Sequence, residues 1–159
     1  MHMTISDSSS RPVTPCLAAD VIIEMVDLPG HPIVLIERKF EPFGWAIPGG
    51  FVDVGETVEQ AAIREMKEEV CLDVSLIHLL GVYSDPSRDH RGHTVTVVYV
   101  GRASGEKPVA ADDAKTVGIF TPDDFPEAMA FDHAQGLRDY LHFKKTGEFK
   151  PVVDYNLQT

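Results

Sequence analysis

The sequence predicts an α/β sandwich built on a mixed β-sheet. Runs of β-branched residues lie before, between and after two segments with helical periodicity, and this alternation favours helices packed against a sheet. The chain has 159 residues, of which 43% are hydrophobic, so it fits one domain with its own core. We expect a disordered, serine-rich tail over residues 1–14 and a single domain over residues 15–159.

The first two strands are expected to form a hairpin. Residues 21–26 and 33–38 are rich in β-branched side chains, and the Leu-Pro-Gly-His sequence of residues 28–31 supplies the turn between them. Residues 43–50 combine short apolar pieces with a Pro-Gly-Gly break, which is typical of a brief strand that runs into a loop. Residues 51–53 are a candidate for another short strand.

The clearest helix spans residues 57–70. Thr57 and Gln60 have the spacing of a capping box, in which each side chain binds the backbone N–H of the other residue. Apolar residues then recur every four positions, at Val58, Ala62, Met66 and Val70. Because this spacing places them on one stripe of a helix, we expect the stripe to face the core.

The second half of the chain continues the alternation. Two longer strands are expected over residues 74–83 and 93–102, joined by a polar loop, and a further strand near residues 117–120 precedes a proline-containing turn. A second helix is predicted to begin with Asp132 as its N-cap and to end at Gly147. The residues expected along one side of this helix are Leu137, Tyr140, Leu141 and Lys144.

The charge balance argues against a polyanionic partner. The chain has 25 Asp and Glu against 14 Lys and Arg, a net charge of -11, which repels nucleic acid and also repels small phosphates unless a divalent cation reverses the local field. No run approaches the roughly 20 apolar residues that cross a bilayer. Two cysteines, Cys16 and Cys71, are too few for a disulfide framework. We therefore expect a cytoplasmic protein with no membrane or nucleic-acid partner.

Three glutamates of the first predicted helix form an acidic patch. Glu65, Glu68 and Glu69 stand at i, i+3 and i+4, which places their Cβ atoms on one face, about 5 to 6 Å apart. Like charges at this spacing destabilise a helix by a few tenths of a kcal/mol per pair, so the patch requires solvent screening or a cation. Taken alone, such a patch is typical of a solvated helix face.

The surroundings of this patch resemble the Nudix box. Gly50 is followed after five residues by Glu56, and seven residues later comes Arg-Glu-Met-Lys-Glu-Glu-Val at residues 64–70, followed by Cys71 and Leu72. This match covers 23 positions, and Cys71, in place of the family's glycine, is its one departure. We expect Cys71 to adopt a left-handed backbone conformation, at a cost of about 1 to 2 kcal/mol, and to be a small apolar residue, not a nucleophile.

The resemblance implies a Nudix-type α/β/α sandwich and a Mg²⁺-dependent hydrolase, with Mn²⁺ as a substitute cation. Hard carboxylate oxygens suit Mg²⁺, whose remaining positions are filled by substrate phosphates and water. The metal site that the resemblance implies comprises Gly50 through its carbonyl, Glu56 through water or a hydrogen bond, and Glu65, Glu68 and Glu69 directly. Arg64 is implied as a residue that orients a neighbouring glutamate.

A base must take the proton of the attacking water. Glu65 is one candidate, beside Glu68 in the catalytic helix. Members of the family also use an acidic residue of a later loop, for which this chain offers Glu106, Asp112 and Asp113. The sequence leaves these candidates open, because acidic residues before a strand are also ordinary turn residues.

Pro86 favours ADP-ribose as the substrate. It lies fifteen residues past Cys71, where the ADP-ribose pyrophosphatase group also has a proline, and this resemblance implies cleavage to AMP and ribose 5-phosphate. The alternatives are a nucleoside triphosphate pyrophosphohydrolase, a sugar-nucleotide hydrolase, or a non-catalytic Nudix-like binding module, against which the complete acidic box argues. A homodimer is the assembly that the resemblance suggests.

Candidate substrate contacts lie around Pro86 and in the aromatic segment before the box. Arg88 and Arg91 are suited to bidentate contacts with phosphate or ribose oxygens, or else are solvent-exposed loop charges. Phe43, Trp45 and Phe51 are candidates for stacking on a nucleobase, or else pack in the core. The two histidines that begin predicted elements, His93 and His133, are expected to be structural or exposed.

Overall fold

The computed structural model describes residues 11–150, and over this range the chain forms a seven-stranded mixed sheet with two α-helices. The predicted tail over residues 1–14 lies largely outside the described residues. The elements are β1 (Cys16–Met25), β2 (Ile33–Arg38), β3 (Trp45–Ala46), β4 (Gly49–Phe51), α1 (Val58–Val70), β5 (Ser75–Tyr83), β6 (Thr94–Ala103), β7 (Ala114–Phe120), the 3-10 turn η1 (Pro122–Asp124) and α2 (His133–Thr146).

The strand β1 organises the sheet, whose main order is β3-β2-β1-β6-β5. It runs parallel to β6 along its whole length, from the pair Cys16 and Thr94 to the pair Met25 and Ala103. On its other edge, β1 pairs antiparallel with β4 near its start and with β2 near its end. This divided edge brings β4, which carries Gly50, against the first half of β1.

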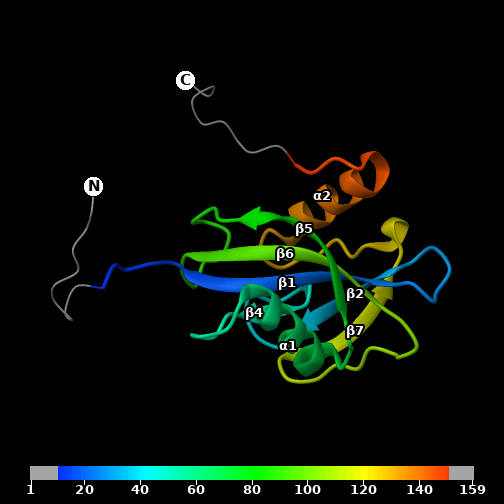
Figure 1. Ribbon diagram of the computed structural model, residues 1–159, viewed down its shortest axis with the longest axis horizontal. Coiled ribbons are helices and arrows are strands. Elements are labelled where there is room, and N and C mark those ends of the chain that lie inside the picture. The colour runs from blue at the N-terminus through cyan, green and yellow to red at the C-terminus, as the bar shows by residue number, and fades with distance from the viewer. Residues whose placement is uncertain (1–10, 151–159) are drawn as a thin grey trace.

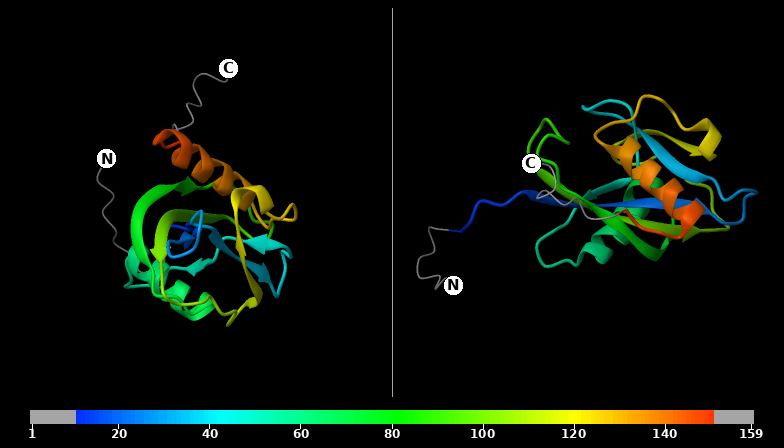
Figure 2. Two further views of the ribbon diagram at one scale, coloured as in Figure 1. Left: turned by 90° about the vertical axis from the view of Figure 1, so that its right-hand side faces the viewer. Right: turned by 90° about the horizontal axis from the view of Figure 1, so that it is seen from above.

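The two helices cover opposite faces of the sheet (Figures 1 and 2). On one face, the α1 residues Ala62, Met66 and Val70 pack in the same core cluster as Val21 and Ile23 of β1. On the other face, Leu137 and Tyr140 of α2 pack in a cluster with Ile22 of β1. Successive side chains of a strand point to opposite faces, so β1 contributes to both cores. The predicted α/β/α sandwich with a mixed sheet is confirmed.

The helix α1 forms as its sequence predicts. Thr57 is the N-cap: its Oγ1 accepts from the Gln60 backbone N–H at 3.1 Å, and Gln60 Oε1 accepts from the Thr57 N–H at 2.8 Å. Cys71 ends the helix with φ 57° and ψ 33°, the left-handed conformation expected where the family has glycine. Its side chain is exposed and so lies outside the core.

Three details differ from the sequence prediction. The first strand begins at Cys16, before the predicted Val21, because β6 pairs with it from that point. The last strand begins at Ala114, because β7 pairs along the whole of β2. Asp132 begins α2 as expected, but its carboxylate caps no backbone N–H and instead binds Arg88. Among residues 11–150, no helix is long and apolar enough to span a bilayer.

Candidate active site

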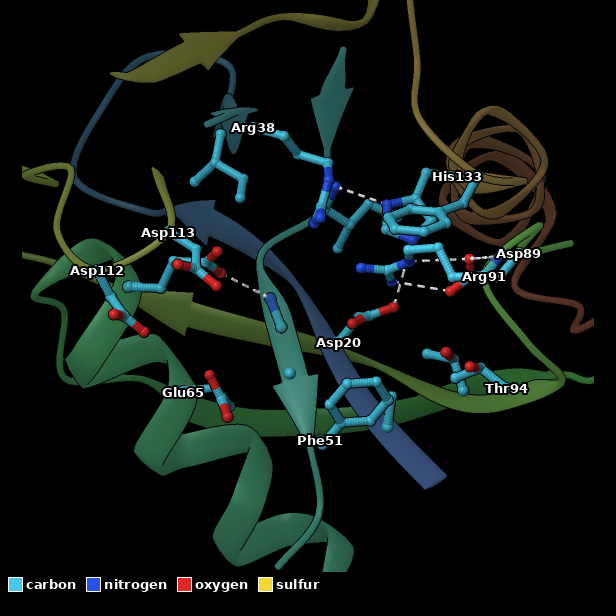
Figure 3. Close-up of a pocket in the computed structure, with 18 of the residues that line it drawn as sticks. Asp20, Arg38, Phe51, Glu65, Asp89, Arg91, Thr94, Asp112, Asp113 and His133 are labelled. Atoms are coloured by element: carbon cyan, nitrogen blue, oxygen red, sulfur yellow. Dashed lines mark hydrogen bonds and ion pairs between the residues drawn. The ribbon is translucent and has the colours of Figure 1, made fainter. Parts of the chain in front are cut away.

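A pocket of about 270 Å³ opens where β4 and the first half of β1 meet α1 (Figure 3). Its wall also includes residues of β2, of β6, of the β5–β6 loop, of the loop before β7 and of the segment that leads into α2. Glu65 and Asp112 lie on one side of β4, and Arg91 and His133 lie on the other. Of the residues that the sequence singled out, the pocket is lined by Gly50, Phe51, Arg64, Glu65, Glu69, Arg88, Arg91, Asp112, Asp113 and His133.

Two glutamates of α1 face this pocket in different environments. Glu69 is only 5% exposed, and its Oε2 accepts a hydrogen bond from the Gly49 N–H at 2.9 Å. Burial raises the pKa of Glu69 to about 7. Glu65 is half-buried, and burial raises its pKa, although Arg64 opposes the shift. A nearby cation would favour the ionised form of both groups, because it offsets the desolvation that raises their pKa values.

The glycines of β4 permit the carboxylates to approach the backbone. A Cβ atom at Gly50 would overlap the Glu65 carboxylate, and a Cβ atom at Gly49 would overlap the Asp20 carboxylate. Only a residue without a side chain fits at these two positions. The strand therefore passes between Asp20 and the glutamates of α1, with its backbone in contact with both sides of the pocket.

Arg64 is the centre of an ion-pair network. Its Nε and Nη2 bind the two carboxylate oxygens of Glu56 at 2.8 and 2.9 Å. Its Nη1 donates to Glu65 at 2.7 Å and to Glu68 at 3.0 Å, and Nη2 also donates to the Phe51 carbonyl at 3.0 Å. These hydrogen bonds raise the pKa of Arg64 and lower that of Glu56. One guanidinium thus orients three of the box glutamates and ties α1 to β4.

The donor set suits a hard divalent cation. Within residues 11–150, no three His, Cys, Asp or Glu side chains already converge as a metal cage. Mg²⁺ commonly binds through one or two carboxylates and completes its octahedron with water and substrate phosphates, so a complete protein cage is not required. Glu65 and Glu69 supply such carboxylates at the pocket wall, beside the Gly50 backbone. The same chemistry serves Mn²⁺.

The opposite wall carries arginines around an aromatic ring. The Arg38 and Arg91 guanidinium carbons lie 4.8 and 5.2 Å from the centroid of the Phe131 ring, within range of cation–π attraction. Arg91 is held by both oxygens of Asp89, at 3.0 and 2.8 Å, and Arg38 Nε donates to the Pro42 carbonyl at 2.8 Å. Burial and the nearby charge of Arg91 lower the pKa of Arg38. This wall offers positive charge to an anionic substrate.

Arg88 lies deeper and is already paired. Its side chain is 4% exposed, so it is not a solvent-exposed loop charge. Nε and Nη2 bind Asp132 at 3.0 and 2.7 Å, and Nη1 donates to Thr96 Oγ1 at 2.7 Å. The guanidinium therefore links the β5–β6 loop to the start of α2 and to β6. Arg88 makes its bidentate contact with Asp132. The sequence had suggested a phosphate or ribose oxygen of the substrate as the partner.

His133 and Asp20 meet at the base of the pocket. His133 Nδ1 accepts from the Ile47 backbone N–H at 3.0 Å, so the neutral ring carries its proton on Nε2, which lies 3.5 Å from Asp20 Oδ2. Burial lowers the pKa of His133 to about 3 and raises the pKa of Asp20 well above its usual range. Both shifts favour the neutral forms, because burial penalises charge.

Several predicted residues do not line the pocket. Pro86 is exposed in the β5–β6 loop, and Phe43 is 65% exposed on the surface. Trp45 packs edge-on against Phe120, with 4.9 Å between ring centroids, on the α2 side of the sheet. Glu106 is exposed and also lies outside the lining. The box residues Glu56 and Glu68 connect to the pocket through Arg64.

The pocket also contains residues that the sequence analysis missed. They include Asp20, Arg38, Asp89, Thr94, Thr96 and Phe131. One signal was present in the sequence: Asp20 interrupts a run of apolar residues in the first strand, and a charged residue in a buried strand is uncommon. Phe131 carried no such signal, although its φ of 53° marks it as an unusual backbone position.

Comparisons with known proteins agree with this geometry. The NUDIX domain family matches residues 15–140. An ADP-ribose pyrophosphatase of Methanocaldococcus jannaschii is 45% identical over 132 residues, which is 82% of this chain and 75% of the relative. The NUDIX domain of Shewanella oneidensis NrtR, solved in complex with ADP ribose, superimposes with a TM-score of 0.74 at 26% identity and covers 87% of this chain and 93% of that one.

A further solved structure was determined with a metal ion. It is a bifunctional NMN adenylyltransferase/ADP ribose pyrophosphatase from Francisella tularensis, complexed with AMP and a Mn ion. It superimposes with a TM-score of 0.65 at 29% identity. The match covers 83% of this chain but 43% of that one, so the similarity concerns one part of the larger protein.

Proposed function

This chain belongs to the Nudix family and is a Nudix hydrolase, and we propose that it cleaves the diphosphate bond of ADP-ribose to give AMP and ribose 5-phosphate. The observation that carries the substrate is the 45% identity to an ADP-ribose pyrophosphatase over most of both chains. The NUDIX domain solved with ADP ribose, which has the same fold, supports the same substrate. We further propose that the cation is Mg²⁺ and that Mn²⁺ substitutes for it.

The two walls of the pocket suit a complex of a divalent cation with an anionic diphosphate. Glu65 and Glu69, with the Gly50 carbonyl, would hold the cation, while Glu56 and Glu68 are oriented through Arg64. When bound, the cation polarises the phosphoryl oxygens and lowers the pKa of a water ligand. On the other wall, positive charge at Arg38 and Arg91 attracts the diphosphate and keeps it oriented.

Proton transfer is assigned to the acidic residues that reach the pocket. Glu65, Asp112 and Asp113 line it, whereas Glu106 does not. The loop with the two aspartates is attached to the end of β2: Lys39 Nζ donates to the Asp112 carbonyl at 2.6 Å, and the Lys39 N–H donates to the Asp113 carbonyl at 3.1 Å. The Ala111 N–H also donates to the Glu69 carbonyl at 3.0 Å, so this loop lies beside α1. We propose that Asp112, Asp113 or Glu65 accepts the proton of the attacking water.

Product identification tests the proposal. The purified protein is incubated in the presence of Mg²⁺ with one compound at a time: ADP-ribose, a nucleoside triphosphate or a sugar nucleotide. The products are then separated by chromatography. We expect AMP and ribose 5-phosphate in equal amounts from ADP-ribose and much slower turnover of the other compounds. A chelator-treated sample serves as the metal-free control.

Three results would redirect the assignment. Release of pyrophosphate from a triphosphate, with no AMP from ADP-ribose, would identify a nucleoside triphosphate pyrophosphohydrolase. Release of a sugar phosphate from a sugar nucleotide, again without turnover of ADP-ribose, would identify a sugar-nucleotide hydrolase. Binding of ADP-ribose without turnover of any compound would support the non-catalytic module that the complete acidic box argues against.

A further inference from the structure

Phe131 is a bulky residue in a backbone conformation that favours glycine. Its φ is 53°, in the left-handed region, whereas Asp132 after it has a φ of -98°. The His133 N–H donates to the Ala130 carbonyl at 3.2 Å and closes a turn around these two residues. A turn with a positive φ at its first central position usually has glycine there, because a side chain at this angle crowds the backbone. Phenylalanine at this position is an outlier that requires an explanation.

Hydrogen bonds on both sides of Phe131 hold this conformation. Before it, the Ala130 N–H donates to the Trp45 carbonyl at 2.8 Å. After it, His133 Nδ1 accepts from the Ile47 N–H at 3.0 Å. The sheet therefore fixes the chain on either side of the turn, and the residue between these points must adopt the angle that joins them. Glycine would satisfy the backbone, so the reason for phenylalanine lies in its side chain.

The other residues with a positive φ differ from Phe131. Within residues 11–150, five of them are glycines, and the remaining three are exposed: His31, Cys71 and Asp112. Phe131 is half-buried, lines the pocket and packs beside the core cluster of α1. An aliphatic side chain would also fill this space, because cores tolerate exchanges between apolar residues of similar volume. Packing alone therefore does not select an aromatic ring.

The ring of Phe131 is shared by two arginines. The guanidinium carbons of Arg38 and Arg91 lie over it, 4.8 and 5.2 Å from its centroid, and both arginines line the pocket. Groups that share one ring are close enough to repel each other, and the charge of Arg91 adds to burial in lowering the pKa of Arg38. The electron-rich face of the ring attracts both cations and so offsets part of their repulsion.

Arg38 is an arginine of the pocket that has no carboxylate partner. Among residues 11–150, its side chain donates only to the backbone carbonyls of Pro42, at 2.8 Å, and Glu41, at 3.4 Å. The other arginines of the lining each form an ion pair: Arg64 with Glu56, Arg88 with Asp132, and Arg91 with Asp89. A half-buried guanidinium without a counter-charge favours an anionic ligand. The ring of Phe131 therefore contacts the positive charge that is available to such a ligand.

We propose that Phe131 is a positioning residue, whose ring holds the Arg38 and Arg91 guanidinium groups where they bind the diphosphate of the substrate. The strained turn is retained because this conformation places the ring against both groups. The inference rests on the proposed function only in taking a diphosphate as the ligand, whatever groups the diphosphate carries. It assigns a role in substrate affinity to a residue outside the acidic box.

Variants that separate the ring from its bulk test the proposal. Binding of α,β-methylene ADP, whose P–C–P bridge is not hydrolysed, is measured with Mg²⁺ by titration calorimetry. Phe131→Leu keeps an apolar side chain at the same backbone angle but removes the π face, so we expect the dissociation constant to rise roughly fivefold to tenfold. Phe131→Tyr keeps the ring and should restore the affinity of the wild type. In turnover of ADP-ribose, Phe131→Leu should raise KM by a similar factor and change kcat much less.

A second pair of variants tests the backbone strain. Phe131→Gly and Phe131→Ala both lack the ring but differ in their tolerance of a positive φ. Glycine usually lowers stability relative to alanine, so a thermal unfolding midpoint that is a few degrees higher in Phe131→Gly is expected only at a strained position. Both variants should bind the diphosphate as weakly as Phe131→Leu. The opposite order of midpoints would show that the turn carries no strain, which would overturn the argument for a selected ring.

A matched control separates positioning from packing. Phe125→Leu changes another half-buried aromatic residue, which packs beside the α2 core cluster and lies outside the pocket. It should lower the unfolding midpoint and leave the affinity for the diphosphate unchanged. Equal affinity of the wild type and Phe131→Leu, or no binding by either, would overturn the proposal. Weak binding by Phe131→Tyr would overturn it as well, because the fit of the side chain, and not its π face, would then be decisive.

The binding experiment is independent of the substrate assignment. If ADP-ribose is not hydrolysed but Phe131→Leu still weakens binding of α,β-methylene ADP, the substrate proposal fails and the role of Phe131 stands. If ADP-ribose is hydrolysed with the same KM by the wild type and Phe131→Leu, the role of Phe131 fails and the substrate proposal stands.

Discussion

The two sides of the pocket are built in different ways. The acidic side comes from a short stretch of sequence, since Gly50, Arg64, Glu65 and Glu69 lie on β4 and on the helix that follows it. The opposite side joins Asp20 of β1, Arg88 of the β5–β6 loop, and His133 at the start of α2. On the first side a guanidinium orients Glu65 at the pocket wall, whereas on the second side Asp20, Arg88 and His133 are all buried.

This difference separates two tasks. A metal site requires several oxygen donors at a set spacing, and one helix provides that spacing by its own periodicity. Selection of a substrate requires contacts to groups several bonds apart, which residues from distant segments can reach. We therefore expect changes on the acidic side to abolish turnover, and changes on the opposite side to alter stability or selectivity first.

Replacing Glu69 should give the largest effect on catalysis. Glu69→Gln keeps an oxygen for the Gly49 N–H but removes the charge that would hold the cation. We expect kcat with ADP-ribose to fall at least about a hundredfold, since the cation supplies several kcal/mol to the transition state. The midpoint of thermal unfolding, measured alongside, should stay within a few degrees of that of the wild type. Unchanged turnover would show that Glu69 is not a metal ligand.

Replacing Arg88 should instead reduce stability. Arg88→Met fills similar space but leaves Asp132 and Thr96 without their buried donors. We expect the free energy of unfolding to fall by about 2 to 3 kcal/mol, because a partly buried ion pair that loses one partner leaves an uncompensated charge. Urea denaturation measures this loss. If stability were unchanged while KM rose strongly, Arg88 would be a substrate contact as the sequence first suggested.

The stability of the metal-free protein should depend on pH through Glu69. Its pKa is about 7 when folded and about 4.5 when unfolded, so the folded state binds more protons between these values. The stabilising contribution of the protonated group is complete below about pH 4.5 and is lost as pH rises through 7, a change of up to a few kcal/mol. Urea denaturation with a chelator, at several pH values, measures it. The free energy of unfolding should change less steeply with pH in Glu69→Gln, and also in the wild type when Mg²⁺ is present.

Replacing Pro86 should give the smallest effect. The residue is exposed and lies outside the pocket lining, so Pro86→Ala should change kcat/KM for ADP-ribose by less than about twofold and stability by less than about 0.5 kcal/mol. Steady-state kinetics across the substrate panel test this expectation. A selective loss of ADP-ribose turnover would show that the loop moves onto the substrate. The division of tasks between the two sides of the pocket would then need revision.

The accuracy of the sequence prediction followed the same division. The helix α1 and its capping box were predicted to the residue, because both depend on side chains three or four positions apart. The left-handed Cys71 was expected for the same local reason. The start of β1 was not predicted, because strand length depends on pairing with β6. For Trp45 the sequence left stacking on a base and packing in the core both open, because its packing against Phe120 depends on β7.

The sequence by itself determined the sandwich of two helices on a mixed sheet and the acidic helix face of a Nudix hydrolase, since hydrophobic periodicity and fixed offsets are local properties of the chain. Only the tertiary structure decided that Arg88 is committed to Asp132 and that Asp20 faces the pocket beside His133. These groups meet because β1 lies at the centre of the sheet, with β4 on one edge and α2 over one face. Burial then shifts the pKa values of Asp20 and His133 towards their neutral forms.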